Sequence, residues 1–183
     1  MVISTHARIA NQASSDYFYH YRKGLIILGS VLPDFNWFSQ PHRGSNLSDH
    51  IRHNEEKIAT TRSYWVKYVR LGNMLHYLCD YFCYAHEDNL NISHGTRHTK
   101  YEFAIGRIFK EGFGVRLRDI PDSDREKLIE NLQKLKENYE KKPGNSTRDL
   151  KYAMTAVEYC MDCMADSPSF ETPMPKKTAN QTI

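Results

Sequence analysis

Residues 71–86 read Leu-Gly-Asn-Met-Leu-His-Tyr-Leu-Cys-Asp-Tyr-Phe-Cys-Tyr-Ala-His and form the most apolar helical pattern in the chain. Apolar residues recur there every three or four positions, which is the period of an α-helix packed on a core. Within this stretch His76 and Asp80 are four residues apart, so on a helix they lie about 40° apart on one face. Burying an imidazole and a carboxylate is costly unless they pair with each other or bind a metal ion. The stretch therefore predicts a core helix that carries a candidate metal site.

The same period runs through most of the chain, while the alternating patterns typical of β-strands are scarce. We therefore predict an all-α fold, a multi-helix bundle. Helices are expected over residues 4–21, 54–69, 71–86, 98–110, 123–142 and 148–164. Between Gly24 and His53 we expect a turn-rich connection that ends in a polar loop, and loops of this length in compact domains are usually functional.

The size and charge of the chain limit its organisation and partners. A length of 183 residues is typical of one domain that buries roughly 70% of its unfolded surface. We predict a single helical domain over residues 1–166 and a mobile tail over residues 167–183, where prolines and lysines have little to pack against. Lys and Arg total 25 against 22 Asp and Glu. These charges are interspersed, so electrostatics does not favour a nucleic-acid partner.

The cysteines and the apolar runs bear on the compartment. No run is long enough to cross a bilayer, and the first residues lack a basic segment followed by an apolar one. We therefore expect no transmembrane segment and no secretory signal. The pairs Cys79/Cys83 and Cys160/Cys163 have helical spacings, whereas secreted disulfide scaffolds usually join distant cysteines. We expect reduced, inert thiols, including Cys83 near the face of His76, in a cytoplasmic protein.

More residues of the metal-ligand type lie at the end of residues 71–86 and after them. His86 comes six residues after Asp80, and His98 and Glu102 repeat the four-residue spacing on the next predicted helix. Zinc prefers imidazole nitrogen and carboxylate oxygen as ligands. The alternative is a plain buried hydrogen bond between His76 and Asp80, without a metal.

Asp34, after Pro33, and one histidine of the His50/His53 pair complete a ligand set large enough for two zinc ions. A shared carboxylate admits a third ion. Two neighbouring metal ions can hold the oxygens of a phosphodiester, lower the pKa of a bound water toward about 7 and stabilise charge on the leaving group. The ligand set therefore predicts hydrolysis by in-line attack of water on phosphorus.

Phe35 and Trp37 follow Asp34 directly and are candidate substrate-binding residues. Aromatic faces bind a cationic headgroup or stack on a flat base. The alternative, given equal weight, is that these rings pack the loop onto the core.

The block from His76 to His86, followed by His98-Thr-Lys-Tyr-Glu102, resembles the zinc-dependent phospholipase C family. The segments Gly29-Ser-Val-Leu-Pro-Asp34 and Thr5-His-Ala-Arg-Ile-Ala10 add to the likeness, which covers roughly residues 3–110. Fungal single-strand nucleases share the family's fold. The resemblance implies an all-helical bundle with a zinc cluster at the base of a cleft.

By the family's pattern, one zinc would be held by Asp34, His53, His76 and Asp80, a second by His86, His98 and Glu102, and a third by His6 with Asp80 bridging. His53 is preferred over His50 because His53-Asn-Glu-Glu opens a predicted helix, as the family's second ligand does. The resemblance also implies that Asp34 accepts the proton of the attacking water.

We therefore predict a zinc-dependent phosphodiester hydrolase of phospholipase C type, acting on a phospholipid headgroup or a soluble phosphodiester. A single-strand nuclease is a less favoured alternative, since Asn54 follows His53 where the nucleases place an aromatic ring. A third hypothesis is a non-enzymatic binding module in which the clustered ligands bind zinc to stabilise the fold.

Overall fold

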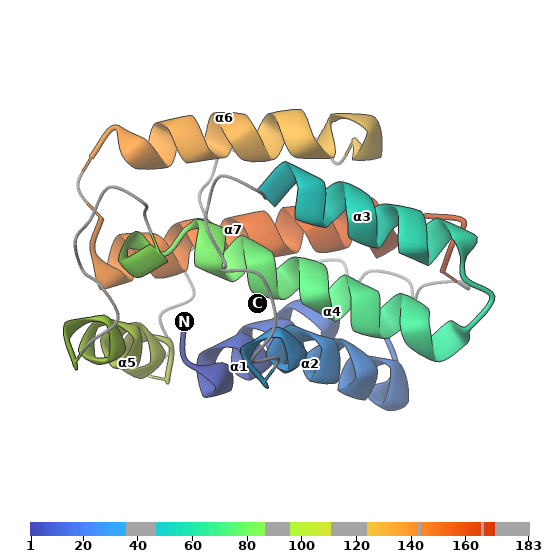
Figure 1. Cartoon of the computed structure of the whole chain (residues 1–183), viewed down its shortest axis with the longest axis horizontal. Helices are drawn as coiled ribbons and strands as arrows, with labels where there is room; N and C mark the ends of the chain where they lie inside the picture. The colour runs from blue at the N-terminus through green and yellow to red at the C-terminus, as the bar shows by residue number, and fades with distance from the viewer. Residues whose placement is uncertain (36–46, 87–95, 111–123, 143, 166, 171–183) are drawn as a thin grey trace, which may run out of the picture.

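The computed structural model describes residues 1–35, 47–86, 96–110, 124–142, 144–165 and 167–170. The helices are α1 (Ile3–Ser14), α2 (His20–Phe35), α3 (Leu47–Thr60), α4 (Tyr64–Tyr81), α5 (Thr96–Lys110), α6 (Leu128–Glu140) and α7 (Ser146–Ala165), with short 3-10 helices η2 (Tyr84–His86) and η3 (Arg125–Lys127). The described residues contain no strand, so the all-α prediction is confirmed. In Figure 1, α4 and α7 run through the middle, with α3 and α6 above them and α1 and α2 below.

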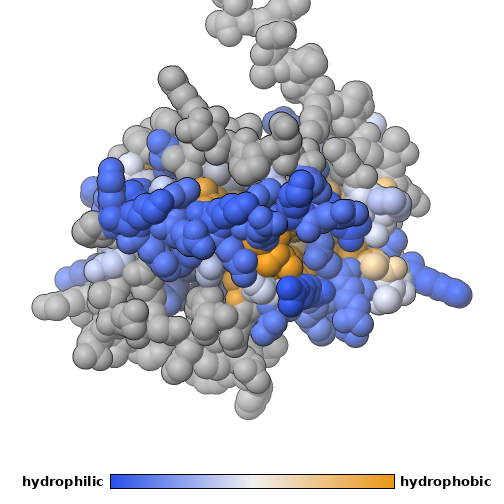
Figure 2. All heavy atoms as spheres, turned by 90° about the horizontal axis from the view of Figure 1, so that it is seen from above, coloured by the Kyte–Doolittle hydropathy of each residue, from blue (hydrophilic) through white to orange (hydrophobic). Residues whose placement is uncertain are grey.

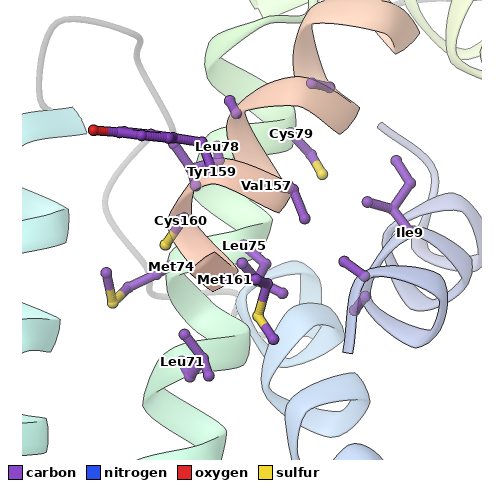
Figure 3. Packing of buried hydrophobic residues seen from close by; sticks show 14 of the residues in the cluster. Ile9, Leu71, Met74, Leu75, Leu78, Cys79, Val157, Tyr159, Cys160 and Met161 are labelled. Carbon is purple, nitrogen blue, oxygen red and sulfur yellow. The ribbon is translucent and has the colours of Figure 1, made fainter. Parts of the chain in front are cut away.

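The apolar stretch of residues 71–86 forms the centre of the core. Leu71, Met74, Leu75 and Leu78 on α4 are buried, and α1, α2, α3 and α7 all contact this helix. Figure 3 shows α7 crossing α4, with Ile9 of α1 at the edge of the cluster on the side of Val157. His76 and Asp80 lie on the buried part of α4, inside the bundle, where their partners must come from neighbouring helices.

The turn-rich connection expected between Gly24 and His53 is wrong for residues 24–35, which form the greater part of α2, and for residues 47–53, which form the first half of α3. Glycine misled the prediction, because Gly29 serves a close approach of two helices and not a turn. A Cβ on Gly29 would overlap the backbone carbonyl of Val69, and a Cβ on Gly72 would overlap that of Ile26. These two glycines let α2 and α4 pack backbone against backbone.

The break between the second and third predicted helices is also displaced. We placed it near Gly72, whereas α3 ends at Thr60 and α4 begins at Tyr64. The short link between them contains Ser63, whose backbone N–H donates to the Thr61 hydroxyl over 3.1 Å. Such local bonds of Ser and Thr compete with helical ones. After Tyr81 the chain leaves the helix, so His86 lies in the separate turn η2.

A substitution at Gly29 tests the close approach of α2 and α4. We expect Gly29→Ala to lower the free energy of unfolding by about 1–3 kcal/mol, because the added methyl group overpacks a backbone contact. Gly24→Ala is the matched control on the same helix, since nothing lies within 4 Å of its Cβ position. It should be neutral or stabilising by up to about 1 kcal/mol. Urea denaturation measures both, and equal effects would contradict the packing described here.

The packed part of the chain extends beyond residue 166. Ser167 is buried, and Phe170 is 5% exposed. The ring of Phe170 lies 5.2 Å from that of Tyr68 and 5.9 Å from that of Phe18. The first residues of the expected tail therefore contribute to the core, and residues 171–183 lie outside the described part of the chain.

The outer surface agrees with a polar helix α6. Figure 2 views the molecule from the α6 side and shows a largely hydrophilic face with small apolar areas. Lys134 and Glu130 form a surface ion pair there, with an N–O distance of 2.6 Å.

Among the described residues, no helix is long and apolar enough to span a membrane. The four cysteines are free and buried.

Candidate metal centre

Asp80, in the last turn of α4, lies at the centre of a group of imidazoles. Its Oδ2 atom is 3.2 Å from Nε2 of His76. Its Oδ1 atom is 3.3 Å from Nε2 of His6 and 3.5 Å from Nε2 of His86. The side chain is 5% exposed. One buried carboxylate thus joins histidines from α1, α4 and η2, segments that are far apart in the sequence.

His76 is oriented by a bond to the neighbouring helix. Its Nδ1–H donates to the backbone carbonyl of Ser30 on α2 over 3.0 Å, which directs Nε2 toward Asp80. This is the arrangement by which a backbone carbonyl orients a metal-binding histidine. Burial lowers the pKa of His76, but the Asp80 carboxylate outweighs it, so the pKa is raised.

His6, on the first turns of α1, is buried and stacks on His76 with ring centroids 4.2 Å apart. Burial, together with the nearby positive charges of His76 and the terminal amine, lowers its pKa to about 3. The ring is therefore neutral at pH 7. Among the described residues, its Nδ1 atom has no hydrogen-bond partner. A buried neutral imidazole beside carboxylates is the form in which histidine binds metal.

Asp34 comes from the last turn of α2, where Pro33 precedes it. One ligand atom each of His6, Asp34 and His76 lies within 4.8 Å of the others. Although the side chain opens to solvent, partial burial raises the pKa of Asp34; Asp80 and Glu102 add to this, while His76 and the Met1 amine oppose it. A carboxylate beside two imidazoles is a combination that binds zinc.

The other side of Asp80 is formed by η2 and α5. His86 Nε2 is 3.0 Å from Oε1 of Glu102. The Met1 amine lies among these groups, 2.6 Å from Asp80 Oδ1 and 3.0 Å from Glu102 Oε1. Burial alone would lower the pKa of that amine, but Asp80 and Glu102 outweigh it and raise the pKa to about 12. In turn, although burial opposes it, His86 and the amine lower the pKa of Glu102 to about 2. The position between the two carboxylates therefore attracts a positive charge strongly.

A fully buried aspartate on α7 fixes this second side, and the sequence did not single it out. Asp149 Oδ2 accepts the backbone N–H of Tyr84 at 2.7 Å and the hydroxyl of Tyr101 at 2.8 Å. Its Oδ1 accepts the hydroxyl of Tyr139 at 2.8 Å. Tyr84 is two residues before His86 in η2, and Tyr101 precedes Glu102 in α5. Asp149 thus holds together the two segments that carry these ligands.

The position of Asp149 explains why it was missed. An acidic residue in the first turn of a helix is expected, since it interacts well with the helix dipole. The available signal was that Asp149 precedes Ala153 by four residues and so lies on the apolar face of the predicted helix. An aspartate there must have buried donors.

The two candidate histidines of α3 differ in their surroundings. His53 is exposed. His50 stacks on Tyr77 with ring centroids 3.9 Å apart and planes at 11°, and Tyr77 meets His76 edge-on at 5.4 Å. The packing thus brings His50, the other histidine of the candidate pair, to the edge of the cluster.

The remaining predicted residues lie at the margins of the described chain. His98 is in the first turn of α5, one turn before Glu102, and its side chain lies outside the described part. Trp37 also lies outside it. Phe35 ends α2 and is 66% exposed.

A hollow of about 610 Å³ leads to the cluster from outside. It is lined by Met1, Val2, Ile3, Ser4, Asp34, Glu102 and Phe103. Its volume lies within the range of small-molecule sites. Asp34 and Glu102 are thus both ligand candidates and part of the wall that an entering molecule would contact.

Comparison with known proteins gives one match. The family model described as zinc dependent phospholipase C matches residues 5–163, which include every ligand candidate named above. No curated protein and no solved structure matches the chain.

Proposed function

The chain belongs to the zinc-dependent phospholipase C family, and from that premise we propose that it hydrolyses the phosphodiester bond of a phospholipid at a zinc cluster built around Asp80. Membership places it generally among phospholipase C-like hydrolases. The observation that carries the specific proposal is the meeting of one buried carboxylate with three imidazoles within 3.5 Å.

The residues of the site fit zinc in their chemistry. His6, Asp34 and His76 would bind one zinc ion, or together with Asp80 they would bind two. His86 and Glu102 would bind another ion on the far side of Asp80. This assignment is supported by the raised pKa of Asp34 and by the neutral His6, whose Nδ1 atom has no hydrogen-bond partner within the described part of the chain. We propose two zinc ions, with Asp80 shared toward a third, and His98 as a further ligand because it precedes Glu102 by one helical turn.

Zinc bound here would lower the pKa of water toward about 7 and stabilise the charge on the phosphate oxygens. The substrate enters through the hollow between α1, α2 and α5, where Ser4 and Glu102 line the wall. A carboxylate oxygen of Asp34, at the same wall, accepts the proton of the attacking water. The bond from phosphorus to the glycerol oxygen then breaks, and this oxygen takes up the proton that Asp34 accepted, relayed by solvent, which yields a phosphomonoester and diacylglycerol.

Metal analysis combined with an activity assay tests the proposal. We expect protein purified without added metal or chelator to contain at least two zinc ions per chain. It should hydrolyse bis(p-nitrophenyl) phosphate, lose this activity with chelator, and regain it with zinc. Zinc without turnover of this diester or of short-chain phosphatidylcholine would instead favour a metal-stabilised binding module. A folded protein that binds no metal would overturn the ligand assignment.

The two histidines of α3 provide a separate prediction. The stacking of His50 on Tyr77 supports His50 as the ligand from this helix, in place of the sequence-based choice His53. We expect His50→Ala to remove zinc or to weaken its binding about 10- to 100-fold, and His53→Ala to leave it unchanged. Zinc content and competition with a coloured chelator measure both variants. The reverse order would restore the choice made from the sequence.

A further inference from the structure

Solvent-facing apolar side chains cover one side of the α2–α4 pair, next to the metal centre. On α2, Leu28, Leu32 and Phe35 follow one another at steps of four and three residues and are 46%, 40% and 66% exposed. On α4, Trp65 is 66% and Val66 38% exposed. An exposed cluster of large apolar residues, unlike single exposed ones, marks a surface that binds something.

A groove runs between these two helices. They point in the same direction, because Tyr21 stacks on Tyr64 near their starts and Ser30 bonds to His76 near their ends. The groove has a volume of about 650 Å³. Along α4 its wall contains every fourth residue, namely Trp65, Val69, Asn73 and Tyr77, and along α2 it contains Leu32, Pro33 and Phe35. Leu28 is not part of the wall.

Along α4 the wall of the groove changes from apolar to polar toward the metal centre, while the α2 wall is apolar. Trp65 lies at its apolar end, and Arg70 and Asn73 add polar groups further along. At the far end Tyr77 stacks on His50 and meets the edge of His76. Pro33 in the wall directly precedes Asp34 in the sequence. A molecule lying in the groove would therefore have its polar end at the candidate zinc cluster.

We infer that this groove holds one acyl chain of the phospholipid substrate, an inference that rests on the proposed function. The α4 wall rises about 18 Å from Trp65 to Tyr77, and the part of it from Trp65 to Val69, about 6 Å, would hold the first few methylenes of the chain. The order of apolar and polar residues along the α4 wall also agrees with a phospholipid lying in the groove. The chain lies along Trp65 and Val69, the ester groups reach Arg70 and Asn73, and the phosphate reaches the metal centre.

A pair of matched substitutions on α2 tests the assignment. Leu32→Glu puts a charge into the groove wall, and Leu28→Glu makes the same change one turn earlier, outside the wall. Both side chains are exposed, so both variants should fold. The substrates are dibutanoyl- and dihexanoyl-phosphatidylcholine, each below its critical micelle concentration. Burying the two additional methylenes of one chain should raise kcat/KM of the unmodified protein at least about tenfold. Leu32→Glu should abolish this preference, whereas Leu28→Glu should keep it.

Binding can be measured without turnover. Trp37 and Trp65 are the two tryptophans of the chain, so Trp37→Phe leaves Trp65 as the one indole reporter. Dodecyl phosphate, a monoester whose chain is long enough to reach Trp65 from the metal centre, should shift its emission to shorter wavelength in a saturable way, and ethyl phosphate should not. Adding Leu32→Glu should remove the shift, and adding Leu28→Glu should not.

The outcomes separate this inference from the proposed function. If the protein hydrolyses diesters but shows no chain-length preference and no response to dodecyl phosphate, the groove assignment is overturned and the function stands. If dodecyl phosphate binds as expected but no diester is hydrolysed, the proposed function fails while the groove still binds alkyl chains. Equal loss in Leu28→Glu and Leu32→Glu would indicate general surface adsorption. If the protein forms a dimer that Leu32→Glu dissociates, the groove binds a second copy of the chain instead. Either of these last results also overturns the assignment.

Discussion

Asp80→Asn is expected to lower hydrolysis of bis(p-nitrophenyl) phosphate by about 10³-fold or more and to reduce the zinc content. The physical reason is the position of this carboxylate, within 3.5 Å of imidazoles from three segments of the chain. An amide has no negative charge, and its NH₂ group would point a donor at a position that should hold a cation. Bulk water has little access to replace the missing oxygen, because Asp80 is only 5% exposed.

Asp16→Asn is the matched control for this prediction. It makes the same chemical change at an exposed position between α1 and α2, away from the cluster. It should retain zinc and full activity. Far-UV circular dichroism of both variants with added zinc verifies folding, and His76→Ala serves as the second variant if Asp80→Asn does not fold. Wild-type turnover in folded Asp80→Asn would refute the proposed zinc cluster.

Asp149→Asn is expected to have the largest effect on stability, with the free energy of unfolding lowered by roughly 2–4 kcal/mol. The carboxylate is 0% exposed and accepts from Tyr84, Tyr101 and Tyr139. The amide nitrogen of asparagine would face one of these donors, which then loses its bond without access to water. Urea denaturation should show a lower midpoint with an unchanged slope.

The same variant tests whether Asp149 positions ligands in addition to stabilising the fold. Because it fixes η2 and α5, we expect zinc at the His86 and Glu102 side to bind about 10- to 100-fold more weakly. Tyr139→Phe, which removes a bond outside those two segments, should destabilise the protein without that loss of affinity. Glu130→Gln on the exposed side of α6 should change stability by less than about 0.5 kcal/mol. Unchanged zinc affinity in Asp149→Asn would reduce its role to stability alone.

Much of the fold could be predicted because the local spacing of apolar residues indicates where the helices lie. The final helix, predicted at 148–164, is observed at Ser146–Ala165, and the helix predicted at 98–110 is observed at Thr96–Lys110. The errors fall where a local signal has a tertiary cause. Gly29 and Gly72 look like turn residues, but they lie inside helices whose backbones touch. Only the partner helix reveals that use of glycine.

The candidate site also has one part that the sequence predicts and another part that only the fold decides. The spacing of His76 and Asp80 on one helix is a local property, so the sequence by itself determined that these two groups share a face, and the apolar surroundings determined that they are buried. The likeness of the sequence to a known family supplied the remaining candidates. Distances between residues of separate segments are not encoded by any local period.

Tertiary structure alone decided which groups meet. It placed His6 of α1 against His76, turned Asp80 toward both, and brought His50 rather than His53 to Tyr77. It also placed Asp149 under the two segments that carry His86 and Glu102, and left the α2–α4 groove open beside Asp34. The physical reason is that a helix specifies one apolar face, whereas the closest approach and rotation of two helices follow from how all the faces pack at once.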